Sequence, residues 1–268
     1  MTERLSSPWW VVTDLDGTLM DHRYDWSPAE PALRWLQGRG IPVIPCTSKT
    51  AEEVNRFRVE AKLRDPYIVE NGGAIHGETA TGEMWEESLG PGWSELKPKL
   101  QQLELDLGAP LQALDALTDA EGQRLLGLTG EPLRQAQRRR WSVPFVPTPP
   151  DVEPRLDALV AAMGLAVVRG NRMSHLLGAQ VSKGNALAAL KQRMGCPEVH
   201  VLALGDSPND LPLLEVADIA VVVPGVEGPH PQLSPGVQSG RFQLAGAAHG
   251  AGWAEAVRRL IPLNNTIS

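Results

Sequence analysis

Four polar segments in this sequence hold residue types that can bind a divalent cation and a phosphoryl group. In chain order they are Asp14-Leu15-Asp16-Gly17-Thr18, Thr47-Ser48-Lys49, Ser182-Lys183-Gly184 and Gly205-Asp206-Ser207-Pro208-Asn209-Asp210. Asp14 and Asp16 are two residues apart, so in extended chain their side chains face the same side. Two such carboxylates repel each other unless a cation lies nearby. Mg²⁺ prefers oxygen ligands, and Asp206 is a natural third ligand for it.

An isolated aspartate pair is more often a solvated turn than a metal site, but the surrounding pattern argues against that interpretation here. Gly17 allows a sharp turn, and Thr18 can present a hydroxyl to an anion. Similar polar residues follow two more apolar segments, 41–46 and 199–204. Because parallel strands end at one edge of a sheet, we expect these polar segments to meet there.

The four segments, in this order, resemble the motifs of the haloacid dehalogenase-like phosphohydrolases. The resemblance implies that Asp14 is a nucleophile that becomes an aspartyl-phosphate, and that Asp16 is first the general acid and then the general base. It also implies phosphate-binding residues, namely Thr47, Ser48, Lys183 and Asn209. The implied Mg²⁺ ligands are Asp14, Asp16 through its carbonyl, and Asp206, with Asp210 in support. A carboxylate nucleophile divides a difficult hydrolysis into two steps, so the chemistry agrees with these roles.

Further segments resemble one branch of that family, the mannosyl-3-phosphoglycerate phosphatases. They are Thr47-Ser48-Lys49-Thr50, Glu70-Asn71-Gly72-Gly73, Arg140 to Phe145, Arg172 to Gly184 and Gly250-Ala251-Gly252-Trp253. The resemblance implies an Mg²⁺-dependent phosphomonoesterase that hydrolyses mannosyl-3-phosphoglycerate, with the glucosyl form as a further substrate. Its product is a compatible solute such as mannosylglycerate. Val143 stands where we expect a glutamate, which leaves the identity of the sugar open.

Four basic residues have two interpretations each. Arg138, Arg139 and Arg140 fit the solvated C-terminus of a helix, where cations complement the dipole. They also fit a clamp for the carboxylate of a glycerate substrate, since guanidinium binds carboxylates well. Lys49 is either an exposed lysine at a helix start or a substrate contact. The six histidines, His175 among them, fit ordinary structural positions.

Strand and helix patterns alternate along the chain and predict an α/β fold with a Rossmann-like, doubly wound parallel sheet. A capping box at Ser27 predicts the start of the first helix, and a tight turn is expected at Asn71. Residues 79–177 separate the second motif from the third and are interpreted as an inserted α/β cap that sets substrate specificity. The catalytic core is then formed by 1–78 and 178–268. Within the cap we expect a helix over 132–140.

Length and charge narrow the class of partner. The 268 residues suffice for two domains, and the net charge of −7 argues against binding to nucleic acid. Two cysteines are too few for a disulfide framework or a zinc site. No segment has the length and apolar character of a membrane span, and residues 1–8 lack a signal-peptide core. We therefore expect a cytoplasmic protein with a small phosphorylated sugar-glycerate as its partner, its oligomeric state being open.

Two other functions remain compatible with the sequence. One is a broader sugar-phosphate phosphatase or a phosphomutase on the same core, which would differ in whether phosphate is released from a single substrate. The other is a non-enzymatic binding protein. The intact set of Asp14, Asp16, Lys183 and Asp206 counts against it, because binding alone does not require all four.

Overall fold

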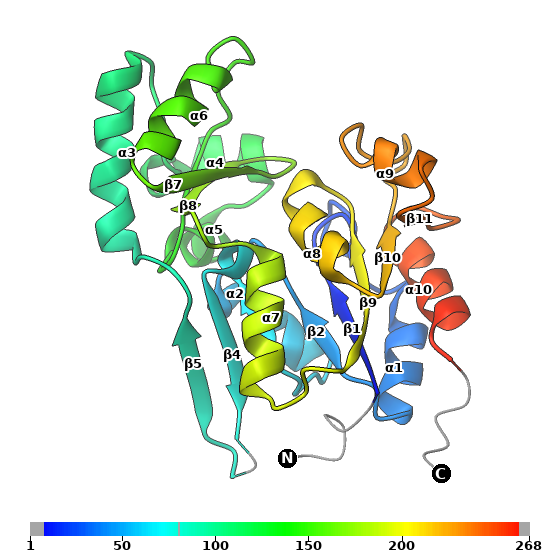
Figure 1. The fold of residues 1–268 in the computed structure, drawn as a ribbon. Helices are drawn as coiled ribbons and strands as arrows, with labels where there is room; N and C mark the ends of the chain where they lie inside the picture. Colours follow the sequence, from blue (N-terminus) through cyan, green and yellow to red (C-terminus); the bar gives the residue numbers. More distant parts are fainter. Residues whose placement is uncertain (1–7, 80, 263–268) are drawn as a thin grey trace.

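The core is built on a parallel sheet, with the cap beside its upper edge (Figure 1). The computed structural model describes residues 8–79 and 81–262. Within these ranges a five-stranded parallel sheet has the order β11-β10-β9-β1-β2. Its strands are β1 (Trp9–Thr13), β2 (Val43–Pro45), β9 (His200–Gly205), β10 (Ile219–Val222) and β11 (Gln243–Leu244). This arrangement confirms the predicted α/β fold with a central parallel sheet.

An antiparallel hairpin extends the sheet beyond β2. Strand β3 (Tyr67–Val69) touches the end of β2 through a parallel bridge between Cys46 and Ile68. Strand β4 (Ala74–Glu78) pairs antiparallel with β3, and β5 (Met84–Ser88) pairs antiparallel with β4. Because β5 pairs with β4 along its whole length, the chain leaves the core after β5, later than the boundary at residue 79 that the sequence predicts.

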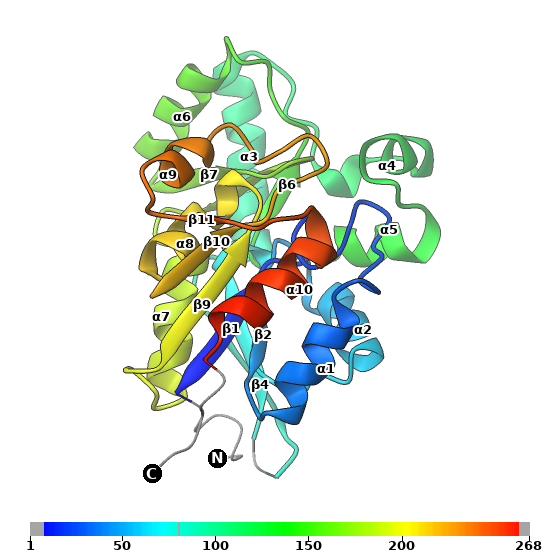
Figure 2. The same ribbon diagram turned by 90° about the vertical axis from the view of Figure 1, so that its right-hand side faces the viewer.

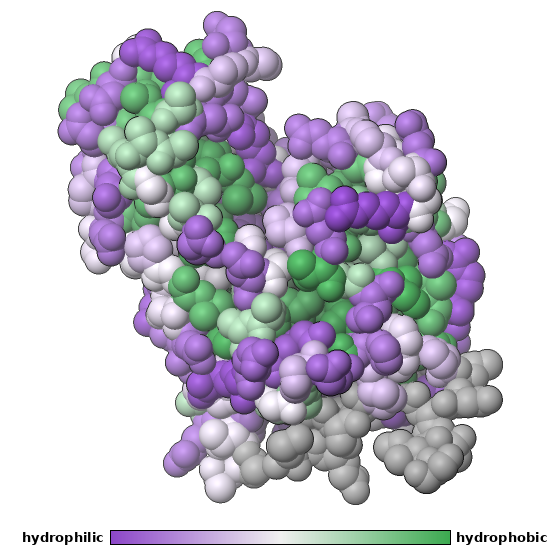
Figure 3. All heavy atoms as spheres, viewed as in Figure 1, coloured by the Kyte–Doolittle hydropathy of each residue, from purple (hydrophilic) through white to green (hydrophobic). Residues whose placement is uncertain are grey.

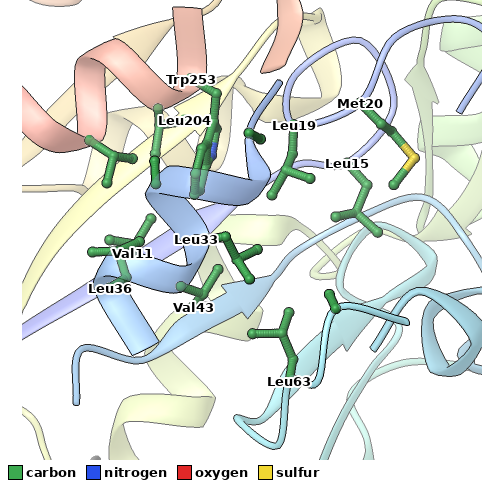
Figure 4. Close-up of a cluster of buried hydrophobic side chains, with 14 of the residues drawn as sticks. Val11, Leu15, Leu19, Met20, Leu33, Leu36, Val43, Leu63, Leu204 and Trp253 are labelled. Carbon is green, nitrogen blue, oxygen red and sulfur yellow. The ribbon is translucent and has the colours of Figure 1, made fainter. Parts of the chain in front are cut away.

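Helices cover both faces of the sheet (Figures 1 and 2). On one face lie α1 (Glu30–Gly38), α2 (Ala51–Glu60) and α10 (His249–Leu260), and on the other lie α7 (Lys183–Arg193) and α8 (Leu211–Val216). Side chains alternate along β1, so Val11 packs with Leu33 and Trp253 (Figure 4), whereas Trp10 packs toward α7 and α8. The short helix α9 (Ser234–Gln238) precedes β11.

The cap has its own sheet and its own hydrophobic clusters. Its strands are β6 (Val143–Phe145), β7 (Leu165–Arg169) and β8 (Ser174–Gly178), in the order β6-β8-β7. Helices α3 (Trp93–Leu107) and α6 (Glu153–Ala162) pack against this sheet. Helices α4 (Asp119–Leu126) and α5 (Gly130–Gln137) form a second, smaller cluster that faces α2. In the space-filling view a notch separates the cap from the core on one side (Figure 3).

Two helices differ from the sequence-based predictions. The capping box at Ser27 is wrong: α1 begins at Glu30 after Ala29, and the Ser27 hydroxyl donates to Asp25 instead. The helix predicted over 132–140 is displaced, because α5 runs from Gly130 to Gln137. The three arginines therefore follow the helix rather than forming its last turn. Among the described residues, no helix has both the length and the apolar character needed to cross a membrane.

Candidate active site

Three of the four polar segments follow β1, β2 and β9 and meet at the carboxyl edge of these strands, as their positions predict, and the start of α7 brings Lys183 to the same place. Asp14 directly follows β1, Asp206 directly follows β9, and the backbone N–H of Asp14 donates to the carbonyl of Leu204 at 3.0 Å. Gly17 turns the chain with a φ of 83°, and a Cβ there would collide with the Asp206 carboxylate. A residue other than glycine would therefore displace one of the acidic groups.

Three buried carboxylates form a cluster that could hold a metal ion. Oxygen atoms of Asp14, Asp206 and Asp210 lie within 4.8 Å of one another. Burial, opposed by Lys183 and reinforced by Asp210, raises the pKa of Asp14 to about 7. Burial and then Asp210 raise the pKa of Asp206 well above its usual value.

The donor set fits a hard divalent cation. In the described part of the chain, the buried Oδ1 of Asp14 has no partner with hydrogen-bond geometry and pairs with the Lys183 ammonium at 3.1 Å by charge alone, so it keeps lone-pair capacity for a cation. An oxygen-binding cation would offset the repulsion among the three carboxylates and lower the raised pKa values of Asp14 and Asp206. The Asp16 carboxylate is outside this cluster.

Lys183 supplies a fixed positive charge at the same place. Its Nζ lies 2.6 Å from Oδ1 of Asp210 and 3.1 Å from Oδ1 of Asp14. Burial alone would lower the pKa of Lys183, but the two aspartates outweigh it and raise that pKa above its usual value. The ammonium is therefore charged at neutral pH. It is positioned by Ser182, whose hydroxyl accepts a hydrogen bond from Asn185 N and caps α7.

Asp16 is paired with Lys49 at the side of the cluster. Nζ of Lys49 lies 2.9 Å from Oδ2 of Asp16, 3.6 Å from Oε1 of Glu53 and 4.5 Å from the ring centroid of Tyr24. Burial opposes the charge of Lys49, but Asp16 and Glu53 raise its pKa above the usual value. The interpretation of Lys49 as an exposed helix-start lysine is wrong, because its side chain is 11% exposed.

The remaining phosphate-binding candidates lie around the same edge. Thr47 is fully buried, and its Oγ1 accepts a hydrogen bond from Lys49 N at 3.3 Å. Ser48 and Asn209 line a cavity of about 90 Å³ between core and cap, together with Asp14, Asp16 and Lys49. Nδ2 of Asn209 donates to Oδ1 of Asn71 at 3.0 Å, and its Oδ1 accepts a short hydrogen bond from Ser207.

Of the three consecutive arginines, Arg139 is the one that lines this cavity. Its side chain is 7% exposed, donates to the carbonyl of Ser48 and lies 3.7 Å from a Glu53 oxygen. Arg138 pairs with Glu52 and Glu131 at the surface. Arg140 pairs with Glu86 at 2.6 Å, on the hairpin of the core. Because α5 ends at Gln137, the three arginines lie beyond the helix and their side chains reach different partners.

Several cap residues at the cavity were not predicted from the sequence. Asn171 donates to Oδ2 of Asp206 at 2.7 Å, so a cap residue touches the carboxylate cluster directly. Arg172 donates to the Tyr24 hydroxyl at 3.1 Å and to the Leu126 carbonyl at 2.8 Å. The segment 170–173 follows β7 in the cap, and a polar loop after a short strand gives no sign of this contact.

His175 also lines the cavity and was predicted to be structural. It is 5% exposed, and within the described residues its Nδ1 has no hydrogen-bond partner. Burial, followed by the charges of Arg139 and Lys183, lowers the pKa of His175 to about 3. The imidazole is therefore neutral at pH 7 and can exchange a hydrogen bond with a bound molecule without adding charge.

The segment Glu70–Gly73 forms a turn that joins the cap to the core. Glu70, Asn71 and Gly72 have φ values of 49°, 60° and 99°, all in the left-handed region. Such strain persists only where surrounding contacts hold it. Here a Cβ on Gly72 would collide with the carbonyl of Ser182, next to Lys183. Asn71 holds Asn209, as described above, so the turn contacts two of the catalytic segments.

The carboxylate of Glu70 binds the chain that carries the cap arginines. It is 1% exposed and accepts hydrogen bonds from Arg140 N at 2.9 Å, Trp141 N at 3.1 Å and the Ser142 hydroxyl at 2.6 Å. Arg139 is the residue immediately before these donors. The sequence predicted only a tight turn at Asn71 and did not reveal this buried junction between Glu70 and the residues 140–142.

This geometry defines a phosphohydrolase-like site, and a family comparison agrees. Residues 11–89 and 155–224 match the model of the haloacid dehalogenase-like hydrolases, which is more than half of the chain. The chain therefore belongs to the haloacid dehalogenase-like hydrolase family. A protein of Methanococcoides burtonii named glucosyl-3-phosphoglycerate/mannosyl-3-phosphoglycerate phosphatase is 32% identical over 273 residues, 96% of this chain and 98% of that protein. Together these findings confirm the predicted family and the predicted enzyme class, a phosphatase.

Solved structures share the fold at lower identity. SMU.1108c from Streptococcus mutans has a TM-score of 0.70 at 16% identity, covering 93% of this chain and 97% of that one. A haloacid dehalogenase-like hydrolase from B. subtilis has a TM-score of 0.69 at 19% identity, covering 94% and 99%. The sucrose-phosphatase of Synechocystis, solved with sucrose and phosphate, has a TM-score of 0.63 at 19% identity, covering 94% and 98%.

Proposed function

We propose that this phosphatase hydrolyses glycosyl-3-phosphoglycerates, the mannosyl form and the glucosyl form, with Mg²⁺ as its cofactor. The observation that carries the proposal is the cavity, which is lined by Asp14 of the carboxylate cluster, by Asp16, and by a buried arginine of the cap, Arg139. The similarity to the M. burtonii phosphatase over nearly the whole chain supports the same substrate class. The products are the glycosylglycerate, a compatible solute, and inorganic phosphate.

In the proposed reaction Asp14 attacks phosphorus and the bond from phosphorus to the glycerate oxygen breaks. Asp16 donates a proton to that leaving oxygen. Water then attacks the aspartyl-phosphate, Asp16 takes the proton from water, and phosphate leaves with the Asp14 carboxylate restored. Lys183 stabilises the negative charge on the transferring oxygens from its position 3.1 Å from Asp14.

Three carboxylates would hold the cation, namely Asp14, Asp206 and Asp210. When bound, Mg²⁺ would neutralise charge on the phosphoryl oxygens and on the attacking carboxylate. The Gly17 turn holds Asp206 against the first strand end, and Asn171 of the cap fixes its second oxygen at 2.7 Å. We propose that Ser48 and Asn209, which line the cavity, bind phosphate oxygens there with Lys183, and that Thr47 supports them from beneath.

The glycerate carboxylate is assigned to the cations at the cap side of the cavity. A phosphate carries about −1.5 to −2 charges at pH 7, and the glycerate adds one more. Lys49, Arg139 and Arg172 all line the cavity and can offset that charge. Val143, by contrast, is fully buried in the hydrophobic cluster of the cap. A glutamate at that position would be surrounded by apolar side chains, so the choice of sugar depends on other residues.

A panel of phosphomonoesters tests the proposal. Release of phosphate should be compared for mannosyl-3-phosphoglycerate, glucosyl-3-phosphoglycerate, 3-phosphoglycerate and mannose 6-phosphate. We expect the largest kcat/KM for the two glycosyl-3-phosphoglycerates. Equal values for all four would contradict the proposed substrate class and favour a broad phosphatase. Conversion of one sugar phosphate into its isomer without release of phosphate would identify a mutase instead.

A further inference from the structure

A second cavity lies beside the active-site cavity, at the boundary between core and cap. Its volume is about 440 Å³, against about 90 Å³ for the first cavity. It is enclosed by three segments: the chain from Met20 to Trp26, the exposed side of α2, and the loop between α4 and α5 in the cap. Neither the four motifs nor the carboxylate cluster contributes to it except through Lys49.

The two cavities share a thin wall. Tyr24, Lys49, Glu53 and Leu128 line both of them. In this wall Lys49 lies against the Tyr24 ring and forms its ion pair with Asp16, the proposed acid for the leaving oxygen. The second cavity therefore begins one side chain away from the position where the leaving group of the substrate must be.

The size of the two cavities decides what each can hold. Sites for organic ligands usually measure about 300–1,000 Å³. The first cavity is below that range, whereas the second is within it. A substrate that carries a hexose needs more room than the first cavity offers.

The chemistry of the second lining suits an uncharged polyhydroxyl group. Tyr24, Trp26 and Phe57 provide aromatic surface, which pairs with the apolar faces of a sugar ring. Four of its five charged side chains form ion pairs, Arg56 with Glu60 at 3.3 Å and Lys49 with Glu53 at 3.6 Å, and the fifth is Arg23. Paired donors and acceptors serve hydroxyl groups well, whereas a second anion would find no free cluster of cations.

The structure of the substrate requires the sugar to lie close to Asp16. In 3-phosphoglycerate, C1 is the carboxylate and O3 carries the phosphate, so O2 is the one hydroxyl that can carry a glycosyl group. The glycosidic oxygen and the scissile phosphoester are then on neighbouring carbons. The hexose must occupy space that adjoins the phosphate site, and the second cavity adjoins it through Lys49 and Tyr24.

We infer that the second cavity binds the glycosyl group, while the first binds the phosphate and the glycerate. The inference rests on the proposed function and assigns its sugar-recognition site. The glycerate spans the wall at Lys49, whose ammonium is then next to the glycerate carboxylate. Residues of the segment 20–26 and of the loop between α4 and α5 determine which sugars are accepted.

Filling the second cavity provides the test. Thr129 lies at its edge, is exposed, and caps no hydrogen bond of α5 through its side chain. Thr129→Trp should lower kcat/KM for mannosyl-3-phosphoglycerate relative to 3-phosphoglycerate by about tenfold or more, since the indole takes the place of the hexose. Thr129→Ala, the matched control, should lower that ratio much less than Thr129→Trp does, because it removes a side chain at the edge of the cavity and leaves the space for the hexose open.

A second blocking variant approaches from the core. Arg23 is exposed at the opposite side of the cavity, so Arg23→Trp is compared with Arg23→Ala in the same way. Melting curves check that each variant is folded. If both tryptophan variants change the two substrates equally, the second cavity does not bind the sugar. If wild type fails to prefer the glycosyl substrate over 3-phosphoglycerate, the proposed function itself is refuted, and this inference with it.

Discussion

Replacing Glu70 with glutamine should weaken the junction between the turn and the cap. The carboxylate accepts hydrogen bonds from Arg140 N, Trp141 N and the Ser142 hydroxyl, and it is 1% exposed. A glutamine oxygen can keep the two bonds on the side of Trp141 and Ser142, but its amide then faces the Arg140 N–H, which loses its acceptor. That unsatisfied N–H costs roughly 1–3 kcal/mol, and the two remaining bonds each lose about 1 kcal/mol of charge assistance. The expected loss of stability is therefore about 3–5 kcal/mol.

Urea unfolding of wild type, Glu70→Gln, Ser142→Ala and the double variant measures this loss. Ser142→Ala removes one donor and leaves the two backbone bonds, so about 1.5–3 kcal/mol is expected. The double variant should be less destabilised than the sum of the two single variants. Both single variants weaken the same hydrogen bond between Ser142 and Glu70, and that bond can be lost only once. Equal free energies of unfolding for wild type and Glu70→Gln would refute this account of the junction.

The same substitution should affect activity selectively. Arg139 directly precedes the residues that Glu70 holds, so loosening them should move the guanidinium in the cavity. We expect kcat/KM to fall more for glycosyl-3-phosphoglycerates than for mannose 6-phosphate, which has no carboxylate. An equal fall for both would show that Glu70 supports folding but not the placement of Arg139.

Four further expectations concern the catalytic groups and the pH dependence of stability. Asp14→Asn should reduce phosphate release by roughly 10³-fold or more, because an amide cannot form the acyl-phosphate, and near-wild-type turnover would contradict the assignment of the nucleophile. Chelation of divalent ions should stop activity, and it should lower the melting temperature because the three buried carboxylates would then repel one another. Added Mg²⁺ should restore both. Full activity in excess chelator would exclude a metal role. Arg139→Ala should lower kcat/KM for glycosyl-3-phosphoglycerates by about 10–150-fold, whereas Arg138→Ala, which breaks a surface ion pair, should change it by less than about fivefold. His175 has a pKa of about 3 in the fold against 6.5 when unfolded, so the unfolded state takes up the extra proton and stability should fall by about 1.4 kcal/mol per unit as pH drops from 6.5 toward 3. His175→Gln should reduce that slope in urea unfolding between pH 7.5 and 5, and an unchanged slope would be evidence against a buried neutral imidazole.

The core of the site could be predicted because local rules determine it. Asp14 and Asp206 directly follow apolar strands, and parallel strands bring their ends together without any knowledge of packing. Ser182 and Thr118 also cap helices as their sequence patterns predict. Chemistry that depends on position along a strand or at a helix start is therefore visible in the sequence.

The cap side of the site depends on contacts that the sequence does not encode locally. The choice of Arg139 over its neighbours follows from α5 ending at Gln137 and from a carboxylate about 70 positions earlier, Glu70. Asn171 reaches Asp206 because the cap docks on the core, and no spacing rule connects the two. The second cavity is likewise a product of that docking.

The junction at Glu70 places a condition on exchanging caps between members of this family. A transplanted cap would have to present two backbone N–H groups and a hydroxyl in the register of Arg140, Trp141 and Ser142, or leave a buried carboxylate unsatisfied in the host. Because the same turn also holds Asn209 and abuts Ser182, a mismatched cap would disturb the phosphate site even if its own fold were intact. Chimeras that keep the host's own residues 138–142, and exchange the rest of the insert, should therefore retain hydrolysis where whole-cap exchanges lose it.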